Sequence, residues 1–182
     1  EALKNGLLLE AKLGVNPFKF GMAGGTDSHT AMTTFEEENF FGKFAGAEPA
    51  TEARYLDLVS QDLRPDGDGS LNVYHWESLA SGLAGVWARE NTREALFDAM
   101  LRKEVFATTG SRIRVRVFGG WDFEPQDAHN RLPANIGYAK GVPMGGDLTG
   151  PPTGSTPALL IQALRDPDGA NLDRIQVVKG WL

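Results

Sequence analysis

A glycine-rich loop that directly follows a short apolar run constrains this chain more than any other feature. The run spans residues 18–23, and the loop after it reads Gly-Gly-Thr-Asp-Ser-His-Thr at residues 24–30. Short apolar runs bounded by glycine are typical of buried strands, and α/β folds place their chemistry where a strand ends in such a loop. The pattern therefore predicts a strand at residues 18–23 and a functional loop after it.

Asp27 and His29 in this loop stand two residues apart, so in an extended chain their side chains point to the same side. A carboxylate oxygen and an imidazole nitrogen on one face form a half-site for a divalent metal such as zinc, manganese or iron. The structural alternative is that Asp27 caps a following helix and His29 forms local hydrogen bonds. A metal site needs three or more protein ligands, and His75 and His129 lie far along the chain. We expect His129 to be exposed to solvent.

The loop resembles the last metal-binding motif, of the Gly-Ser-Asp-Ala-His type, of the PHP (polymerase and histidinol phosphatase) metallohydrolase superfamily. The resemblance to one branch of it, the DUF3604 proteins, is closer and continues along the chain. It is carried by Leu-Gly-Val-Asn-Pro-Phe-Lys-Phe-Gly at residues 13–21, Gly-Val-Trp-Ala at 85–88, Ala-Thr-Thr-Gly-Ser-Arg-Ile at 107–113, Gly-Val-Pro-Met-Gly-Gly at 141–146 and Leu-Asp-Arg-Ile-Gln at 172–176.

This resemblance implies a barrel of parallel strands surrounded by helices, with metals at the C-terminal ends of the strands. It also implies hydrolysis of phosphate esters or of related sulfate esters, and it matches Asp27 and His29 to the family's last ligand pair. The superfamily's early His-x-His motif and its middle Glu and His ligands have no counterpart in the sequence. We therefore expect the chain to be the C-terminal part of such an enzyme and to hydrolyse little or no ester alone.

The pattern of apolar residues divides the chain into two regions. Residues 1–109 are expected to form the C-terminal part of a PHP-like, distorted TIM-type α/β barrel. Residues 110–182 are rich in glycine and proline, and Val115 and Val117 alternate with arginines as in a half-buried strand, which predicts an antiparallel β-rich segment without a long helix.

Periodicity and capping residues then predict the individual elements. Gly14 is a natural end for the first helix, and Asn91 is the expected N-cap of a later one. Helices are expected at residues 1–13, 35–44, 51–63 and 95–103. Strands are expected at residues 18–23, 81–88, 105–108, 113–117, 158–164 and 174–179, with 81–88 as the last barrel strand.

A second candidate site lies where the two regions meet. Thr109, Ser111 and Arg112 surround a glycine, and hydroxyls, backbone N–H groups and a guanidinium suit phosphate or sulfate. These residues are the candidates for substrate binding. The alternative is a turn between two strands, with Arg112 on a hydrated face.

Charge and composition narrow the classes of partner. The 24 acidic residues outnumber the 18 basic ones and give a net charge of −6, which argues against a nucleic-acid partner. A small anionic ester remains compatible, because bound metal supplies local positive charge. No apolar run approaches the roughly 20 residues of a membrane span, so no membrane partner is expected. The absence of cysteine excludes disulfides and thiolate metal sites.

Two functional hypotheses follow from these observations. The first is a metal-dependent hydrolase of phosphate or sulfate esters that binds manganese, zinc or iron through Asp27, His29 and further ligands. The second is a non-catalytic β-rich module that packs against a partner or forms a homo-oligomer. The second accounts equally well for residues 110–182, but it does not account for the Asp-x-His loop.

Overall fold

The computed structural model describes residues 1–32, 35–36, 42–44, 51, 56–60, 64–68, 71–78 and 80–182, with only the backbone of Ser60 and Trp76. In chain order the elements are α1 (Ala2–Leu13), β1 (Leu58–Ser60), β2 (Val73–Tyr74), the 3₁₀ turn η2 (His75–Glu77), β3 (Leu83–Val86), α2 (Arg93–Leu101), β4 (Val105–Thr108), β5 (Arg114–Gly120), the 3₁₀ turn η3 (Pro125–His129), α3 (Pro133–Lys140), β6 (Gly141–Pro143) and β7 (Ala158–Leu164).

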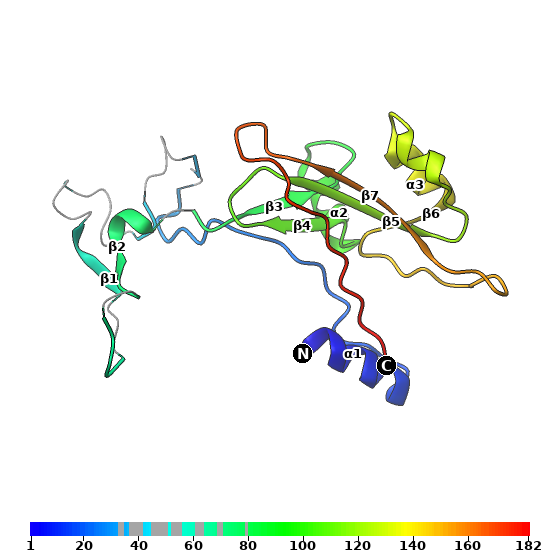
Figure 1. The fold of residues 1–182 in the computed structure, drawn as a ribbon, viewed down its shortest axis with the longest axis horizontal. Coiled ribbons are helices and arrows are strands. Elements are labelled where there is room, and N and C mark those ends of the chain that lie inside the picture. Colours follow the sequence, from blue (N-terminus) through cyan, green and yellow to red (C-terminus); the bar gives the residue numbers. More distant parts are fainter. Residues whose placement is uncertain are drawn as a thin grey trace.

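Within the described residues the strands form three small antiparallel sheets, which are β1–β2, β3–β4 and β6–β5–β7. Figure 1 shows β1 and β2 at one end of the molecule, α3 and β6 at the other, and β3–β4 between them. The chain is therefore a mixed α and β structure. The side chains that are both apolar and buried are few within the described residues, and they are Ala99, Phe118 and Leu160.

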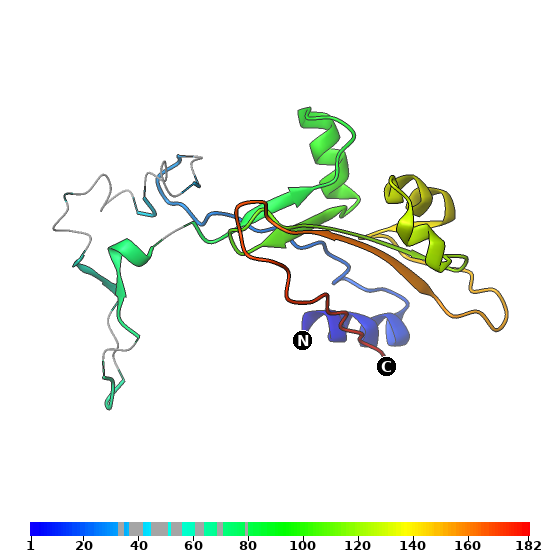
Figure 2. The same cartoon turned by 45° about the horizontal axis from the view of Figure 1, so that its top comes forward.

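The first helix forms as its sequence predicts. Gly14 ends α1 in the left-handed conformation, with φ of 73°, and its N–H donates to the carbonyl of Glu10. Leu3, Leu8 and Leu13 on this helix remain exposed. Figure 2 shows α1 lying apart from the sheets, with the C-terminal end of the chain beside it.

The β3–α2–β4 unit differs from the predicted barrel segment. Strands were expected in both places, and both form, but β3 pairs antiparallel with β4, from Leu83 opposite Thr108 to Val86 opposite Val105. A barrel of βα units needs a helix that returns the chain so that successive strands run parallel. Here α2 instead stands at the tip of a hairpin, and the described residues form no closed barrel. The N-cap of α2 is Thr92 rather than Asn91, because the Thr92 hydroxyl accepts the N–H of Ala95.

Residues 110–182, which were expected to be β-rich, contain the antiparallel β6–β5–β7 sheet. Strand β5 lies in the centre of its sheet and pairs antiparallel with β6 and with all seven residues of β7. Phe118 on β5 is buried beneath α3, where Gly137 leaves room for its ring. The eight-residue α3 was not predicted, but it is shorter than three turns.

A buried carboxylate joins the β3–β4 hairpin to the β5 sheet. Glu104 is 3% exposed, and its two oxygens accept hydrogen bonds from Arg102 Nε at 3.0 Å and from the Tyr138 hydroxyl at 2.5 Å. Arg116 on β5 donates to the same hydroxyl at 2.8 Å and lies 4.4 Å from the ring centroid of Trp87. Burial and the hydrogen bond to Glu104 raise the pKa of Tyr138. The phenol therefore stays protonated and donates to the carboxylate.

Several predicted elements do not form. Residues 18–23 contain no strand, and Phe20 and Met22 are exposed, because the segment passes β4 without pairing to it. Within the helix expected at 51–63, residues 58–60 instead form β1, where pairing with β2 overrides the local periodicity. Residues 52–55 and 61–63 of that range lie outside the described residues. Residues 174–179 are exposed and irregular, because no described strand lies alongside to pair with them. Half of the helix expected at 35–44, residues 37–41, lies outside the described residues.

Candidate functional site

Asp27 and His29 lie side by side, as their spacing predicts. The Asp27 Oδ1 to His29 Nε2 distance is 3.5 Å, and the two side chains are 63% and 57% exposed. The backbone is not the extended strand that was expected, since Asp27 has φ of 56°, a left-handed conformation that aspartate tolerates better than most residues. The pair thus converges through a turn and faces solvent.

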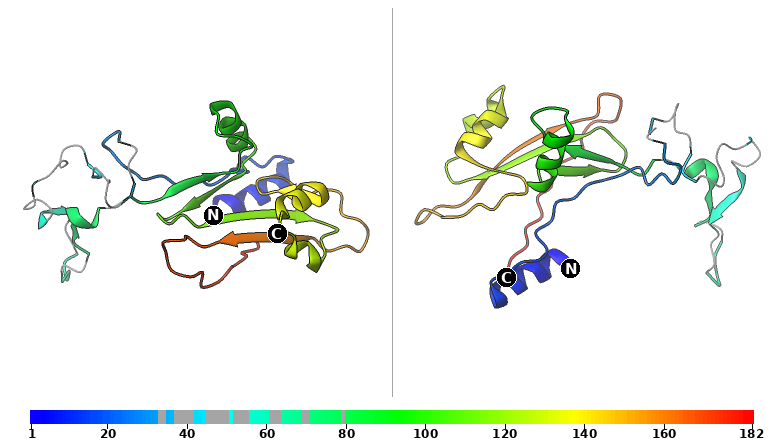
Figure 3. Two further views of the ribbon diagram at one scale, coloured as in Figure 1. Left: turned by 90° about the horizontal axis from the view of Figure 1, so that it is seen from above. Right: turned by 180° about the vertical axis from the view of Figure 1, so that it is seen from behind.

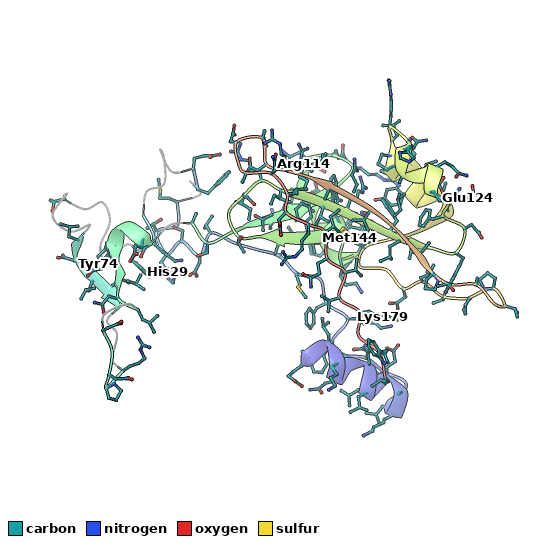
Figure 4. The ribbon with its side chains drawn as sticks, viewed as in Figure 1. His29, Tyr74, Arg114, Glu124, Met144 and Lys179 are labelled. Carbon is teal, nitrogen blue, oxygen red and sulfur yellow. The ribbon has the colours of Figure 1, made fainter. Side chains whose placement is uncertain are left out.

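The segment at residues 42–44 holds this loop in place. The N–H of His29 donates to the carbonyl of Lys43 at 2.7 Å, and His29 forms an isolated parallel bridge with Phe44. The His29 and Phe44 ring centroids are 5.3 Å apart. Ser28 adds a hydroxyl contact to Thr30 at 2.8 Å. The imidazole is therefore anchored by its backbone and by one ring face. Figure 4 labels His29 and Tyr74 in the half of the molecule that carries β1 and β2.

Lys43 is the residue of this site that the sequence analysis missed. Its ammonium lies 3.2 Å from Asp27 Oδ2 and 2.6 Å from the hydroxyl oxygen of Ser81. The side chain is only 14% exposed, although Asp27 itself faces solvent. The hydrogen bond from Lys43, more than the nearby imidazole, lowers the pKa of Asp27. The carboxylate is therefore ionised, as a metal ligand must be.

A cavity of about 520 Å³ opens beside the Asp27–Lys43 pair. Ser81 and Glu77 line it, together with Thr109 from the end of the β3–β4 unit. The N–H of Ser81 donates to the carbonyl of Thr26 at 3.0 Å, which ties this wall of the cavity to the Asp-x-His loop. The cavity thus gathers charged and hydroxyl-bearing residues from four separate parts of the chain. Figure 3 shows this end of the molecule from two further directions.

The three residues of the predicted anion pocket do not come together. Thr109 lines the Asp27 cavity, whereas Ser111 and Arg112 line a different cavity of about 370 Å³. The Arg112 guanidinium pairs with Glu36, and its backbone N–H donates to Asp166 Oδ2 at 2.6 Å. These donors are already engaged, so the arrangement matches the alternative of a turn between strands more closely than a pocket for phosphate.

The Asp27–His29 geometry fits a metal half-site. Two ligands about 2.0–2.1 Å from a tetrahedral zinc ion are separated by roughly 3.3 Å, close to the 3.5 Å observed between Oδ1 and Nε2. Both side chains are accessible, so further ligands or water can reach such an ion. Within the described part of the chain, no three His, Asp or Glu side chains are grouped closely enough to hold one. The pair has the geometry to supply two ligands to such an ion.

The repeated Asp-x-His spacing at residues 127 and 129 does not form a second half-site. His129 is exposed, as expected, but Asp127 is turned into the structure, where Lys140 Nζ contacts its two oxygens at 2.8 and 3.0 Å. Asp127 also accepts the N–H of Glu124 at 2.8 Å. Its carboxylate is thus committed to joining η3 and α3.

These features describe a mixed α/β protein with an exposed Asp–His pair at the edge of a lysine-containing cavity. The family model described as "Protein of unknown function (DUF3604)" matches residues 1–182, so the chain belongs to the DUF3604 family. No curated protein and no solved structure matches the sequence. No helix in the described part of the chain is both long enough and apolar enough to cross a membrane.

Proposed function

We propose that this protein is a metal-dependent hydrolase of phosphate or sulfate esters, in which Asp27 and His29 are two of the metal ligands. The observation that carries the proposal is the convergence of an ionised carboxylate and an imidazole at the edge of a cavity, 3.5 Å apart. The resemblance of the loop to the last ligand motif of the PHP superfamily supports the same assignment. The barrel that this resemblance implies would need strands from outside the described residues.

The residues present favour manganese, zinc or iron as the metal, since the half-site combines one oxygen and one nitrogen ligand and the chain has no cysteine. A bound divalent ion would lower the pKa of a water molecule and stabilise negative charge on the ester oxygens. Asp27 and His29 would hold the ion. The exposure of both side chains leaves room for a substrate beside it.

The experiment is an assay of aryl phosphate and aryl sulfate hydrolysis by the full-length protein, with manganese, zinc or iron added. Asp27→Asn and His29→Gln should each lower kcat/KM by about a hundredfold or more, because a catalytic site is lost when its metal dissociates. Asp173→Asn and His129→Gln are matched controls, since both positions are exposed and outside the cavity. Equal activity in all four variants would contradict the proposal.

A non-catalytic packing or oligomerisation module is the second candidate. It is favoured by the apolar side chains that stay exposed near the C-terminal end, among them Val178 at 85% and Trp181 at 72%. Such side chains are typical of surfaces that another protein covers. Light scattering over a range of protein concentrations distinguishes this candidate, because a self-associating chain gains mass as the concentration rises.

A further inference from the structure

We propose that Lys43 is the anion-binding residue of this site. Its ammonium binds Asp27 when no cation is present, and it binds an anionic oxygen of a tetrahedral phosphate or sulfate group once a cation occupies the Asp27–His29 pair. The inference rests on the proposed function, because it names the residue by which that hydrolase would recognise the charged group of its ester. Lys43 thereby takes the anion-binding role that the sequence assigned to Ser111 and Arg112, which line another cavity.

The position of Lys43 supports this role. Two of the three N–H donors of an ammonium are directed at described partners, Asp27 Oδ2 and Ser81 Oγ. Because the Ser81 oxygen accepts from Lys43, its own O–H proton is available to a second acceptor. The Thr109 side chain lines the same cavity. A tetrahedral oxyanion in this cavity would therefore meet one ammonium and one or two hydroxyl groups.

The charges around the cavity make anion binding depend on the cation. Asp27 and Lys43 neutralise each other, and Glu77, another lining residue, adds a negative charge. The net charge of the described lining residues is thus negative, which disfavours an anion. A divalent cation bound at Asp27 would make this net charge positive. The cation and the ammonium also compete for the same carboxylate. By linkage, cation and anion should each raise the affinity for the other.

Isothermal titration calorimetry of the full-length protein tests this inference, with Mn²⁺, inorganic phosphate and sulfate as the probes. We expect Mn²⁺ to tighten phosphate or sulfate binding about tenfold or more, and the stronger of the two anions indicates the ester class. Lys43→Met should weaken anion binding about tenfold or more in the presence of Mn²⁺, because a charged hydrogen bond is lost. It should leave Mn²⁺ affinity equal or higher, because a competing cation is removed.

Two further variants and one control complete the test. Lys43→Arg, which keeps the positive charge, should retain part of the affinity for phosphate or sulfate. Ser81→Ala should lower that affinity several-fold without changing the affinity for Mn²⁺. Lys19→Met is the matched control, since Lys19 also contacts two acidic side chains, Glu10 and Asp147, but lies outside the cavity. If Lys43→Met does not fold, as judged by circular dichroism, Lys43→Arg and Ser81→Ala provide the test.

The outcomes distinguish the inference from the proposed function. A folded Lys43→Met protein that loses Mn²⁺ and phosphate affinity together would show that Lys43 only supports the loop, and unchanged phosphate affinity would equally overturn the inference. If the wild type binds no metal, the proposed function fails. The inference then fails with it, because it requires a cation at the Asp27–His29 pair. A wild type that binds Mn²⁺, but binds phosphate and sulfate no more tightly with Mn²⁺ than without it, would overturn the inference alone.

Discussion

The hydrogen bond from Tyr138 to Glu104 should be a principal stabilising contact between the β3–β4 unit and α3. Tyr138→Phe removes only the hydroxyl and keeps the edge-on packing of the ring against Phe118, whose centroid lies 5.1 Å away. Glu104 is 3% exposed and would keep Arg102 as its remaining side-chain partner. The substitution therefore removes the hydrogen bond to a buried carboxylate, together with the one that the hydroxyl accepts from Arg116.

The cost follows from the surroundings of the carboxylate. A hydrogen bond to a charged group is worth about 1.5–3 kcal/mol in mutational series. A cavity of about 960 Å³ borders both Glu104 and Tyr138, so water can replace part of the lost contact. We therefore expect a loss of about 1–2 kcal/mol in the free energy of unfolding, and a fall in Tm of roughly 2–8 °C for a chain of this size.

Urea denaturation of four proteins measures this effect. They are the wild type, Tyr138→Phe, Glu104→Gln and the double variant, which together form a double-mutant cycle. A coupling energy of about 1 kcal/mol or more between the two positions is expected. Additive effects, or a Tyr138→Phe protein within about 0.5 kcal/mol of the wild type, would refute the reasoning.

Two further predictions concern the same half of the molecule. Gly137→Ala should lower the free energy of unfolding by about 1–3 kcal/mol, because its Cβ would overlap the buried ring of Phe118; thermal unfolding measures this, and an unchanged Tm would count against it. Asp127 should make the free energy of unfolding depend on pH, because the hydrogen bond from Lys140 lowers the pKa of Asp127 in the folded state. Its contribution is present above about pH 4, near the unfolded pKa, and is lost as the pH falls through the lower folded pKa. Urea titrations from pH 7 to pH 3 should therefore show the difference between wild type and Asp127→Asn shrinking in acid, and a constant difference would exclude this linkage.

Local sequence signals predicted the elements that depend on local physics. Gly14 ends α1 because glycine adopts a left-handed conformation freely. Strand β7 forms at Ala158–Leu164, the predicted range, where a short apolar run ends just before the turn at residues 166–169. The convergence of Asp27 and His29 was likewise predicted from a two-residue spacing, although a turn rather than a strand produces it.

Features that depend on contacts between distant residues were not predictable in this way. Lys43 reaches Asp27 and Ser81 only because the segment at residues 42–44 bonds to His29. No spacing or motif marks that lysine in the sequence. The segment at residues 51–63 carried a helical pattern, yet β1 forms there because β2 offers a partner. The separation of Thr109 from Arg112 depends on Asp166, far along the chain, which binds the Arg112 backbone.

The most direct test of the central claim is the metal content of the full-length protein and its variants. Equilibrium dialysis against manganese and against zinc, followed by elemental analysis, measures bound ions per chain. The account predicts at least about one bound ion in the wild type, a loss of about tenfold or more in affinity for Asp27→Asn and for His29→Gln, and no change for Asp173→Asn and His129→Gln. Equal metal binding in all of these proteins would contradict the assignment of Asp27 and His29 as ligands.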